Sequence, residues 1–330
     1  MDCDIVVDGG GSGTRLGLAM AGAVIVRREG FTCNPRSLGA PDGAEALAEM
    51  LEALWQSRPP GILRVRTTCL ALSNVSTTED LSLVRAGLRR AASWCAPLGA
   101  ERCWVMNDIV PLVTTGRCDA AVICGTGTGF AALGPEGAWS RASGLDYLLA
   151  DEGGGFDLGL RGLRAVVRAL DGRGPWTALV THGRAWGGDS ALHLCRKVYG
   201  SPASKVTVAT FAPLTLTAAR DGDPVAQGLV REAAVELALG LRAVADRCGL
   251  AAPVRFGFAG SLLLEPRSPL LESFLEELAR EPGRWRGAPL PRDTLALVAE
   301  LAARLGQGAA VLDRVPLASR LDDAAAEEGR

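Results

Sequence analysis

The chain has 330 residues, 48% of them hydrophobic, and a formal net charge of −2. This length allows two packed domains, and this composition is typical of a globular protein rather than a disordered one. The nearly balanced charge excludes the basic face on which sequence-independent nucleic-acid binding depends, and no apolar run is long enough to cross a bilayer. The first residues also lack a secretory signal pattern, so we expect a cytoplasmic protein without a nucleic-acid or membrane partner.

Nine cysteines are scattered along the chain, and none of them forms a Cys-x-x-Cys pair. Zinc and iron–sulfur sites are usually built from closely spaced cysteines, so this pattern argues against both. We expect free thiols that pack as small hydrophobic side chains. Arginine supplies nearly all of the positive charge, and we attribute the scarcity of lysine (Lys197 and Lys205 only) to codon bias.

The first 108 residues alternate between strand and helix patterns. An apolar strand over 4–8 leads into a glycine turn, which is followed by strands over 14–22 and 23–28. Apolar residues at helical spacing predict helices over 43–56 and 79–95. Between and after them, the sequence predicts strands over 64–74 and 102–108, the second of which ends at Asp108.

A second glycine turn follows about 115 residues after the first. The segment "CDAAVICGTGTGFAALG" (118–134) repeats the order of "CDIVVDGGGSGTRLGL" (3–18): an apolar strand, a turn rich in glycine and threonine, and a strand of small apolar residues. Two copies at a domain-sized spacing predict a duplicated fold with two glycine hairpins. Further along, we expect helices over 157–170 and 223–249, a strand over 254–263 that runs into a glycine turn, a closing pair of helices over 291–315, and a polar, frayed end over 318–330.

Three kinds of structure have a glycine turn after a strand: a phosphate loop, a dinucleotide-binding turn and an ordinary tight hairpin. A phosphate loop of the Walker type needs a lysine directly after its glycines, and neither turn contains one. The dinucleotide fingerprint needs a third glycine, but that position is Thr14 in the first turn and Phe130 in the second. An ordinary tight hairpin remains, although it does not explain Asp8 before the first turn or the Ser and Thr residues in both. Glycine N–H groups can form an anion nest, and a neighbouring aspartate can hold magnesium through water, so we favour nucleotide binding.

An ordered set of motifs resembles one family. "VVDGGGSGTR" and "ICGTGTG" are similar to its two phosphate motifs, "FAGSLL" (258–263) to its adenosine motif, and "LADEGGGFDLG" (149–159) to a segment at its sugar site. "NDIVPLVTTG", "FTCNP" and "KVTVATFAPLTLTAARDGDP" also match, so that the resemblance covers most of residues 1–312. The family is the BadF/BadG/BcrA/BcrD ATPases, within the sugar kinase/actin/Hsp70 superfamily, which includes N-acetylglucosamine and glucosamine kinases.

The resemblance implies an α/β fold in which duplicated RNase-H-like (actin-like ATPase) domains close on an interdomain cleft. We expect an N-terminal domain over 1–115, a C-terminal domain over 116–295, a closing helix over 296–315 that returns to the N-terminal domain, and a flexible tail over 316–330. By analogy with relatives, we also expect a homodimer. The implied activity is an ATP-dependent kinase that phosphorylates a hydroxyl of a small amino sugar.

The resemblance also assigns roles to individual residues. Asp108 is the expected general base, although Asn107-Asp108 in this position is also a common way to cap a following helix. Asp8 is expected to hold Mg²⁺ through water. The residues expected to bind ATP are Gly10, Gly11, Ser12, Thr14, Arg15, Gly125, Thr126, Gly127, Thr128, Gly260 and Ser261. Those expected to bind the sugar are Asn34, Asp108, Asp146, Asp151 and Glu152.

The sugar segment departs from the family pattern. Family members that act on N-acetylglucosamine tend to have a Trp-Gly pair before Gly-Asp-Glu-Gly, whereas this chain has Leu145-Asp146-Tyr147 and then Ala150. A carboxylate at Asp146 suggests the hypothesis of an acceptor with a free, cationic amine. A kinase of a cyclitol or another small polyol in secondary metabolism is the alternative. Two further alternatives are a non-catalytic nucleotide-binding regulator and an activator of a radical dehydratase, which would hold an iron–sulfur cluster through Cys118 and Cys124.

Overall fold

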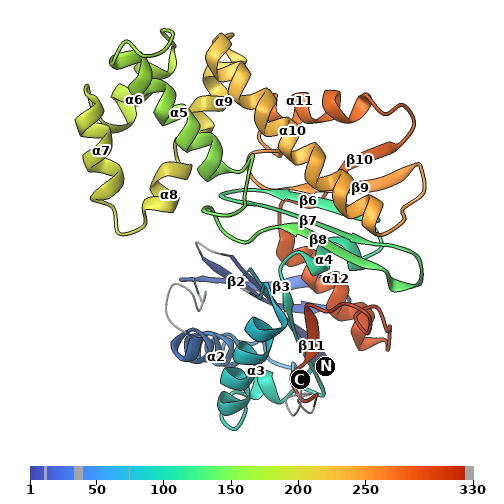
Figure 1. The fold of residues 1–330 in the computed structure, drawn as a ribbon. Helices are drawn as coiled ribbons and strands as arrows, with labels where there is room; N and C mark the ends of the chain where they lie inside the picture. Colours follow the sequence, from blue (N-terminus) through green and yellow to red (C-terminus); the bar gives the residue numbers. More distant parts are fainter. Residues whose placement is uncertain (11–12, 33–39, 74, 324–330) are drawn as a thin grey trace. The chain divides into compact units, whose positions relative to one another are not determined.

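The computed structural model describes residues 1–323 except 11–12, 33–39 and 74 (Figure 1). The chain divides into two compact units. The first unit contains residues 1–118, 136–139 and the chain from Asp293 onward, and the second contains 119–135 and 140–292. The limits drawn from the sequence, at 115 and 295, lie near two of these transitions. Within the described residues, no helix has the length and apolar character needed to span a membrane.

The first unit is built on a six-stranded sheet in the order β11-β5-β4-β1-β2-β3. β1, β4 and β5 are parallel neighbours, whereas β1–β2–β3 form an antiparallel meander. The elements are β1 (Asp2–Gly9), β2 (Thr14–Met20), β3 (Ala23–Gly30), α2 (Ala40–Gln56), β4 (Arg64–Leu72), α3 (Thr78–Ala91), the 3₁₀ turn η1 (Ala96–Gly99), β5 (Arg102–Asn107), α4 (Val110–Thr114), α12 (Thr294–Gly306) and β11 (Ala318–Arg320).

Helices cover both faces of this sheet, because its central strands are apolar on both sides. In β1, Ile5 and Val7 pack into the cluster that contains α2 and α3, whereas Val6 points into the cluster that contains α12. This alternation follows from the two-residue period of a strand. Figure 1 shows α2 and α3 on one side of the sheet and α12 on the other. The closing helix is therefore part of the core of the first unit.

The second unit contains a five-stranded sheet in the order β10-β9-β6-β7-β8. β10, β9 and β6 are parallel, and β6–β7 is an antiparallel hairpin. The elements are β6 (Ala120–Cys124), β7 (Thr128–Leu133), the 3₁₀ turn η2 (Pro135–Gly137), β8 (Trp139–Ser143), α5 (Gly155–Leu170), α6 (Leu179–Gly187), α7 (Ala191–Tyr199), α8 (Ser204–Ala209), α9 (Ala212–Arg220), α10 (Pro224–Arg247), β9 (Val254–Ala259), α11 (Pro269–Ala279) and β10 (Trp285–Pro289). One hydrophobic cluster joins the sheet to α5, α9, α10 and α11.

Two expectations for the end of the chain were wrong. The closing pair of helices is a single helix, α12, which ends at Gly306; Gly308 then adopts φ = +86°, a left-handed conformation that breaks the helix. Residues 318–320, expected to be frayed, form β11 and pair antiparallel with β5.

The segment 205–224 contains two helices, α8 and α9. Pro213 stands in the first turn of α9.

Candidate functional site

The carboxyl ends of β1, β4 and β5 lie in one row at the edge of the first sheet. Gly9 pairs with Leu72, and Leu72 pairs with Asn107. The first glycine turn and Asp108 therefore follow strands that end at the same edge. Ligands of α/β proteins commonly bind at the carboxyl ends of parallel strands. As the sequence predicted, the turn leads into a strand, β2, and not into a helix.

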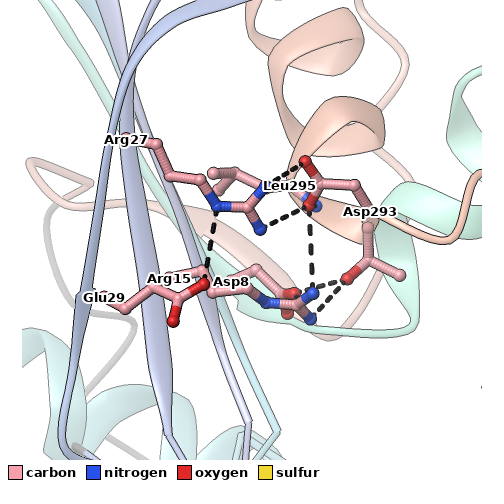
Figure 2. Close-up of polar contacts among 7 residues, drawn as sticks. Asp8, Arg15, Arg27, Glu29, Asp293 and Leu295 are labelled. Atoms are coloured by element: carbon pink, nitrogen blue, oxygen red, sulfur yellow. Dashed lines mark hydrogen bonds and ion pairs between the residues drawn. The ribbon is translucent and has the colours of Figure 1, made fainter. Parts of the chain in front are cut away.

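Asp8 is a buried carboxylate with two polar partners, Thr294 and Arg15, and Figure 2 labels Arg15 next to Asp8. Arg15 forms an ion pair with Asp8 Oδ2, and Thr294 Oγ1 donates a hydrogen bond to the same oxygen. Arg15 Nη2 also donates to Thr294 Oγ1 at 2.9 Å. Asp293 caps α12 and receives two hydrogen bonds from Arg27, at 2.8 and 3.1 Å. The N-terminus of α12 thus closes a charged network around Asp8.

Asp108 directly follows β5 and is partly exposed, whereas Asn107 is buried. Asn107 Nδ2 donates to the Val75 carbonyl at 2.7 Å, and Asn107 Oδ1 accepts from the Ile109 N–H at 3.0 Å. The N-cap of α4 is Ile109, and that helix starts without a side-chain cap. Asn107 therefore makes hydrogen bonds at the turn that leads into α4, and the role of Asp108 stays a prediction.

The second glycine turn packs against the start of α5. The Gly125 N–H donates to the Gly127 carbonyl, and the Gly125 carbonyl accepts from the Gly155 N–H at 2.8 Å. A Cβ on Gly155 would lie 2.8 Å from the Gly125 carbonyl oxygen, and one on Gly154 would lie 2.9 Å from Gly127 Cα. The glycine run before α5 therefore exists because the helix N-terminus meets the hairpin backbone directly.

Gly260 stands at the same strand edge as this turn. β6 and β9 are parallel, with Ile123 paired to Ala259, so that Cys124 and Gly260 end neighbouring strands. Gly260 has φ = +97°, and a Cβ there would lie 2.1 Å from the Cys124 carbonyl oxygen. Only glycine fits this approach. Ser261, which follows it, is exposed.

The predicted sugar residues Asp146, Asp151 and Glu152 lie on one loop. Asp151 is buried and has φ = +69°. Its Oδ1 accepts from the Thr128 N–H at 3.2 Å, and its own N–H donates to Ser143 Oγ at 3.1 Å. Thr128 Oγ1 also donates to the Glu152 carbonyl at 3.2 Å. The second glycine turn and the sugar segment therefore form one hydrogen-bonded group.

Lys205 on α8 binds two of these carboxylates. Its Nζ forms an ion pair with Asp146 Oδ1 and lies 3.3 Å from Asp151 Oδ2. The free-amine hypothesis rests on the negative charge of Asp146, and the structure gives this charge a cationic partner in Lys205. The hypothesis itself stays a prediction.

Cys118 and Cys124, the two cysteines considered for an iron–sulfur cluster, are both buried. Burial raises the pKa of the Cys124 thiol to about 12, with a smaller contribution from the nearby Asp151 carboxylate. Cys118 Sγ donates to the Leu112 carbonyl at 3.2 Å. In the part of the chain that the structure covers, no three His, Cys, Asp or Glu side chains are grouped so as to hold a metal ion.

Gly11, Ser12 and Asn34 lie outside the described residues. Of the other predicted residues, Gly10 donates its N–H to the Gly13 carbonyl at 2.9 Å, and Thr14 begins β2 as a buried residue. Sequence reasoning missed Thr294 and Lys205. A lysine in a chain that has only two was a usable signal. Thr294 carried none, because it lies 286 residues from Asp8.

Comparisons with known proteins agree on one family. The model of the "BadF/BadG/BcrA/BcrD ATPase family" matches residues 7–281. An N-acetylmuramic acid/N-acetylglucosamine kinase from Clostridium acetobutylicum is 26% identical over 254 residues, which cover 73% of this chain and 79% of the relative. An N-acetyl-D-glucosamine kinase from Dictyostelium discoideum is 28% identical over 189 residues, which cover 53% of this chain and 57% of the relative.

A solved structure supports the same fold. The crystal structure of a proposed N-acetylglucosamine kinase from Chromobacterium violaceum superposes with a TM-score of 0.69 at 26% identity, covering 91% of this chain and 98% of that one. The predicted α/β, actin-like ATPase fold is therefore confirmed.

Proposed function

The chain belongs to the BadF/BadG/BcrA/BcrD ATPase family, and we propose that it transfers the γ-phosphate of ATP to a hydroxyl of a small amino sugar of the N-acetylglucosamine or glucosamine type. It is a phosphotransferase with an alcohol group as acceptor, since the relatives that it matches are named as sugar kinases. The observation that carries the proposal is the shared strand edge in each unit. One edge has the first glycine turn after β1 and Asp108 after β5, with β4 between these strands, and the other has the second glycine turn next to Gly260.

In this proposal, each glycine turn contacts phosphate oxygens. Gly10, Thr14 and Arg15 act in the first unit, and Gly125 to Thr128 act in the second, through backbone N–H groups and hydroxyls. Gly260 and Ser261 lie against the adenosine. Carboxylate oxygen is a ligand type that magnesium prefers, and Asp8 supplies one at the first turn. Magnesium, when bound there through water, screens the charge of the phosphates.

Asp108 accepts the proton of the sugar hydroxyl while the hydroxyl oxygen attacks the γ-phosphorus. The bond from that phosphorus to the bridging oxygen of ADP breaks, so that the products are the phosphorylated sugar and ADP. A partly exposed carboxylate directly after a buried strand suits this role, because the strand fixes the position of its backbone. Asn34, Asp151 and Glu152 would hold the remaining sugar hydroxyls.

An acceptor panel tests the proposed function. ADP release is measured with Mg-ATP and N-acetylglucosamine, glucosamine, glucose or an aminocyclitol. We expect acceptor-dependent turnover with an amino sugar and weaker turnover with glucose. The same low ADP release with and without every acceptor would contradict the proposal, whereas turnover confined to the aminocyclitol would keep the kinase and replace the substrate class.

A further inference from the structure

Lys205 contacts two carboxylates, Asp146 and Asp151, of the loop that carries the predicted sugar residues. Its Nζ contacts Asp146 Oδ1, lies 3.3 Å from Asp151 Oδ2 and lies 5.6 Å from the centre of the Tyr147 ring. The Asp151 side chain is 6% exposed, whereas those of Lys205 and Asp146 are 29% and 46% exposed. The Asp146–Lys205 pair is therefore more accessible to a small ligand than Asp151 is.

The position of Lys205 is set by the packing of α8 on α5, which Figure 1 shows side by side. A Cβ on Gly159 of α5 would lie 2.2 Å from the Val208 carbonyl oxygen of α8, so the two helices approach backbone to backbone. Ser204 Oγ donates to the Val198 carbonyl at 3.0 Å and ties the start of α8 to α7. These contacts hold Lys205 next to the loop that precedes α5.

Asp146 is fixed by its main chain as well as by Lys205. It has φ = +78°, a conformation that favours glycine. Its carbonyl accepts from the Ala150 N–H at 3.0 Å, and its Oδ1 accepts from the Tyr147 N–H at 2.9 Å. The carboxylate is thus held at one place in the loop, five residues before Asp151.

We propose that Lys205 determines the charge preference of the acceptor site. Its ammonium offsets one of the two negative charges of Asp146 and Asp151 and repels a second cation, so that it shifts the preference of the site toward neutral, N-acylated amino sugars and away from sugars with a free, protonated amine. This inference rests on the proposed function, because it takes Asp146 and Asp151 as part of the sugar site. It reverses the hypothesis drawn from the sequence, in which Asp146 attracts an amine.

The test compares N-acetylglucosamine with glucosamine at a pH at which the glucosamine amine is protonated. Both kcat/KM and the Kd measured by titration calorimetry are determined for the wild type and for Lys205→Met, Lys205→Arg and Lys205→Met/Asp146→Asn. Lys197→Met is the matched control, because Lys197 is the other lysine and contacts the ring and carbonyl of Trp186. A change of one unit charge near the ligand is expected to move the preference about tenfold.

We expect the wild type to prefer N-acetylglucosamine and Lys205→Met to shift the ratio about tenfold toward glucosamine. Lys205→Arg and Lys197→Met should keep the wild-type ratio, and the added Asp146→Asn change should remove the shift. A loss of packing alone would lower kcat/KM equally for both substrates, and this decrease would persist in the Lys205→Met/Asp146→Asn variant. An unchanged ratio in Lys205→Met, or a shift that survives Asp146→Asn, would overturn the inference while leaving a working kinase. A wild type that neither binds nor phosphorylates either sugar would overturn both proposals.

Discussion

Thr294 Oγ1 donates a hydrogen bond to Asp8 Oδ2, and 286 residues of chain separate the two side chains. The same hydroxyl accepts from Arg15 Nη2 at 2.9 Å, so it is used both as donor and as acceptor. The first turn of α12 therefore completes the surroundings of the carboxylate that is expected to order magnesium. The helix that closes the first unit also orients the side chain at its first glycine turn.

Thr294→Val keeps the shape of the side chain and removes its hydroxyl. We expect a loss of about 1.5–3 kcal/mol of unfolding free energy, because the lost hydrogen bond is made to a charged group. We also expect the apparent affinity for Mg²⁺, measured through activity, to fall roughly tenfold, as it does for other residues that orient a metal-binding side chain. Urea unfolding and a Mg²⁺ titration of ADP release measure the two effects. Thr294→Ser should behave like the wild type, and equal results for Val and Ser would count against the role of the hydroxyl.

Gly127→Ala and Gly125→Ala form a second matched pair. A Cβ on Gly127 would lie 2.2 Å from Asp151 Oδ2, whereas one on Gly125 would have no described atom within 4 Å. We expect Gly127→Ala to displace the Asp151 carboxylate, to cost about 1–3 kcal/mol of stability and to raise the KM for the acceptor. Gly125→Ala should change stability by less than about 0.5 kcal/mol and should raise the KM for ATP, since its methyl group would occupy the proposed phosphate position.

Steady-state kinetics with each substrate varied in turn, together with thermal unfolding, separate the two glycine variants. The prediction would be wrong if both variants raised the KM for the acceptor, or if Gly125→Ala kept the wild-type KM for ATP. Either result would show that Gly127 does not act on the acceptor site alone, or that Gly125 does not lie at the phosphate site.

Because several thiols are buried, we expect the protein to lose stability at alkaline pH. Burial raises the pKa of Cys3 and Cys95 to about 11 and, with a smaller effect of Asp151, that of Cys124 to about 12, from 9.0 in each case. Between pH 9 and pH 11–12 the folded protein keeps these protons, whereas the unfolded chain releases them. The contribution of these thiols to the unfolding free energy is therefore fully present below about pH 9 and is lost as the pH rises toward 11–12. At pH 10, ionisation of Cys124 in the unfolded chain alone should lower the unfolding free energy by on the order of 1 kcal/mol.

The measurement is the change in Tm between pH 8 and pH 10. Cys124→Ala should show a smaller decrease than the wild type, and Cys195→Ala, which changes an exposed thiol, should show the same decrease. Parallel pH profiles for the wild type and Cys124→Ala would refute the assignment.

Local patterns predicted most of the fold. Both glycine hairpins, α2, α5 and α10 follow from apolar periodicity and from turn residues, which act over a few neighbours. The prediction of a second closing helix was wrong. The segment between Gly308 and Pro316 has only seven residues, and its Leu312 and Val315 pack in the core of the first unit within a short turn, in which the Val315 N–H donates to the Leu312 carbonyl at 3.0 Å. β11 could not be foreseen, because its pairing depends on the open edge of β5 and not on its own side chains.

The candidate site divides in the same way. Asp8, Asp108 and the glycine turns stand in short motifs, so they could be predicted as site residues from the sequence. The Asp8–Thr294 and Asp146–Lys205 contacts join residues 286 and 59 positions apart, and only the packing of α12 and α8 brings them together. That packing changed the interpretation of Asp146 from a charge that attracts an amine to half of an ion pair.

The most direct test of the central claim is phosphate transfer by Asp108→Asn. The phosphorylated sugar is quantified by mass spectrometry from Mg-ATP and the best acceptor of the panel, beside the wild type. Without a carboxylate to take the hydroxyl proton, kcat should decrease roughly 10²–10⁴-fold. The KM for ATP and the Tm should stay close to the wild-type values, since asparagine keeps the size of the side chain. Product formation at the wild-type rate in Asp108→Asn would contradict the account.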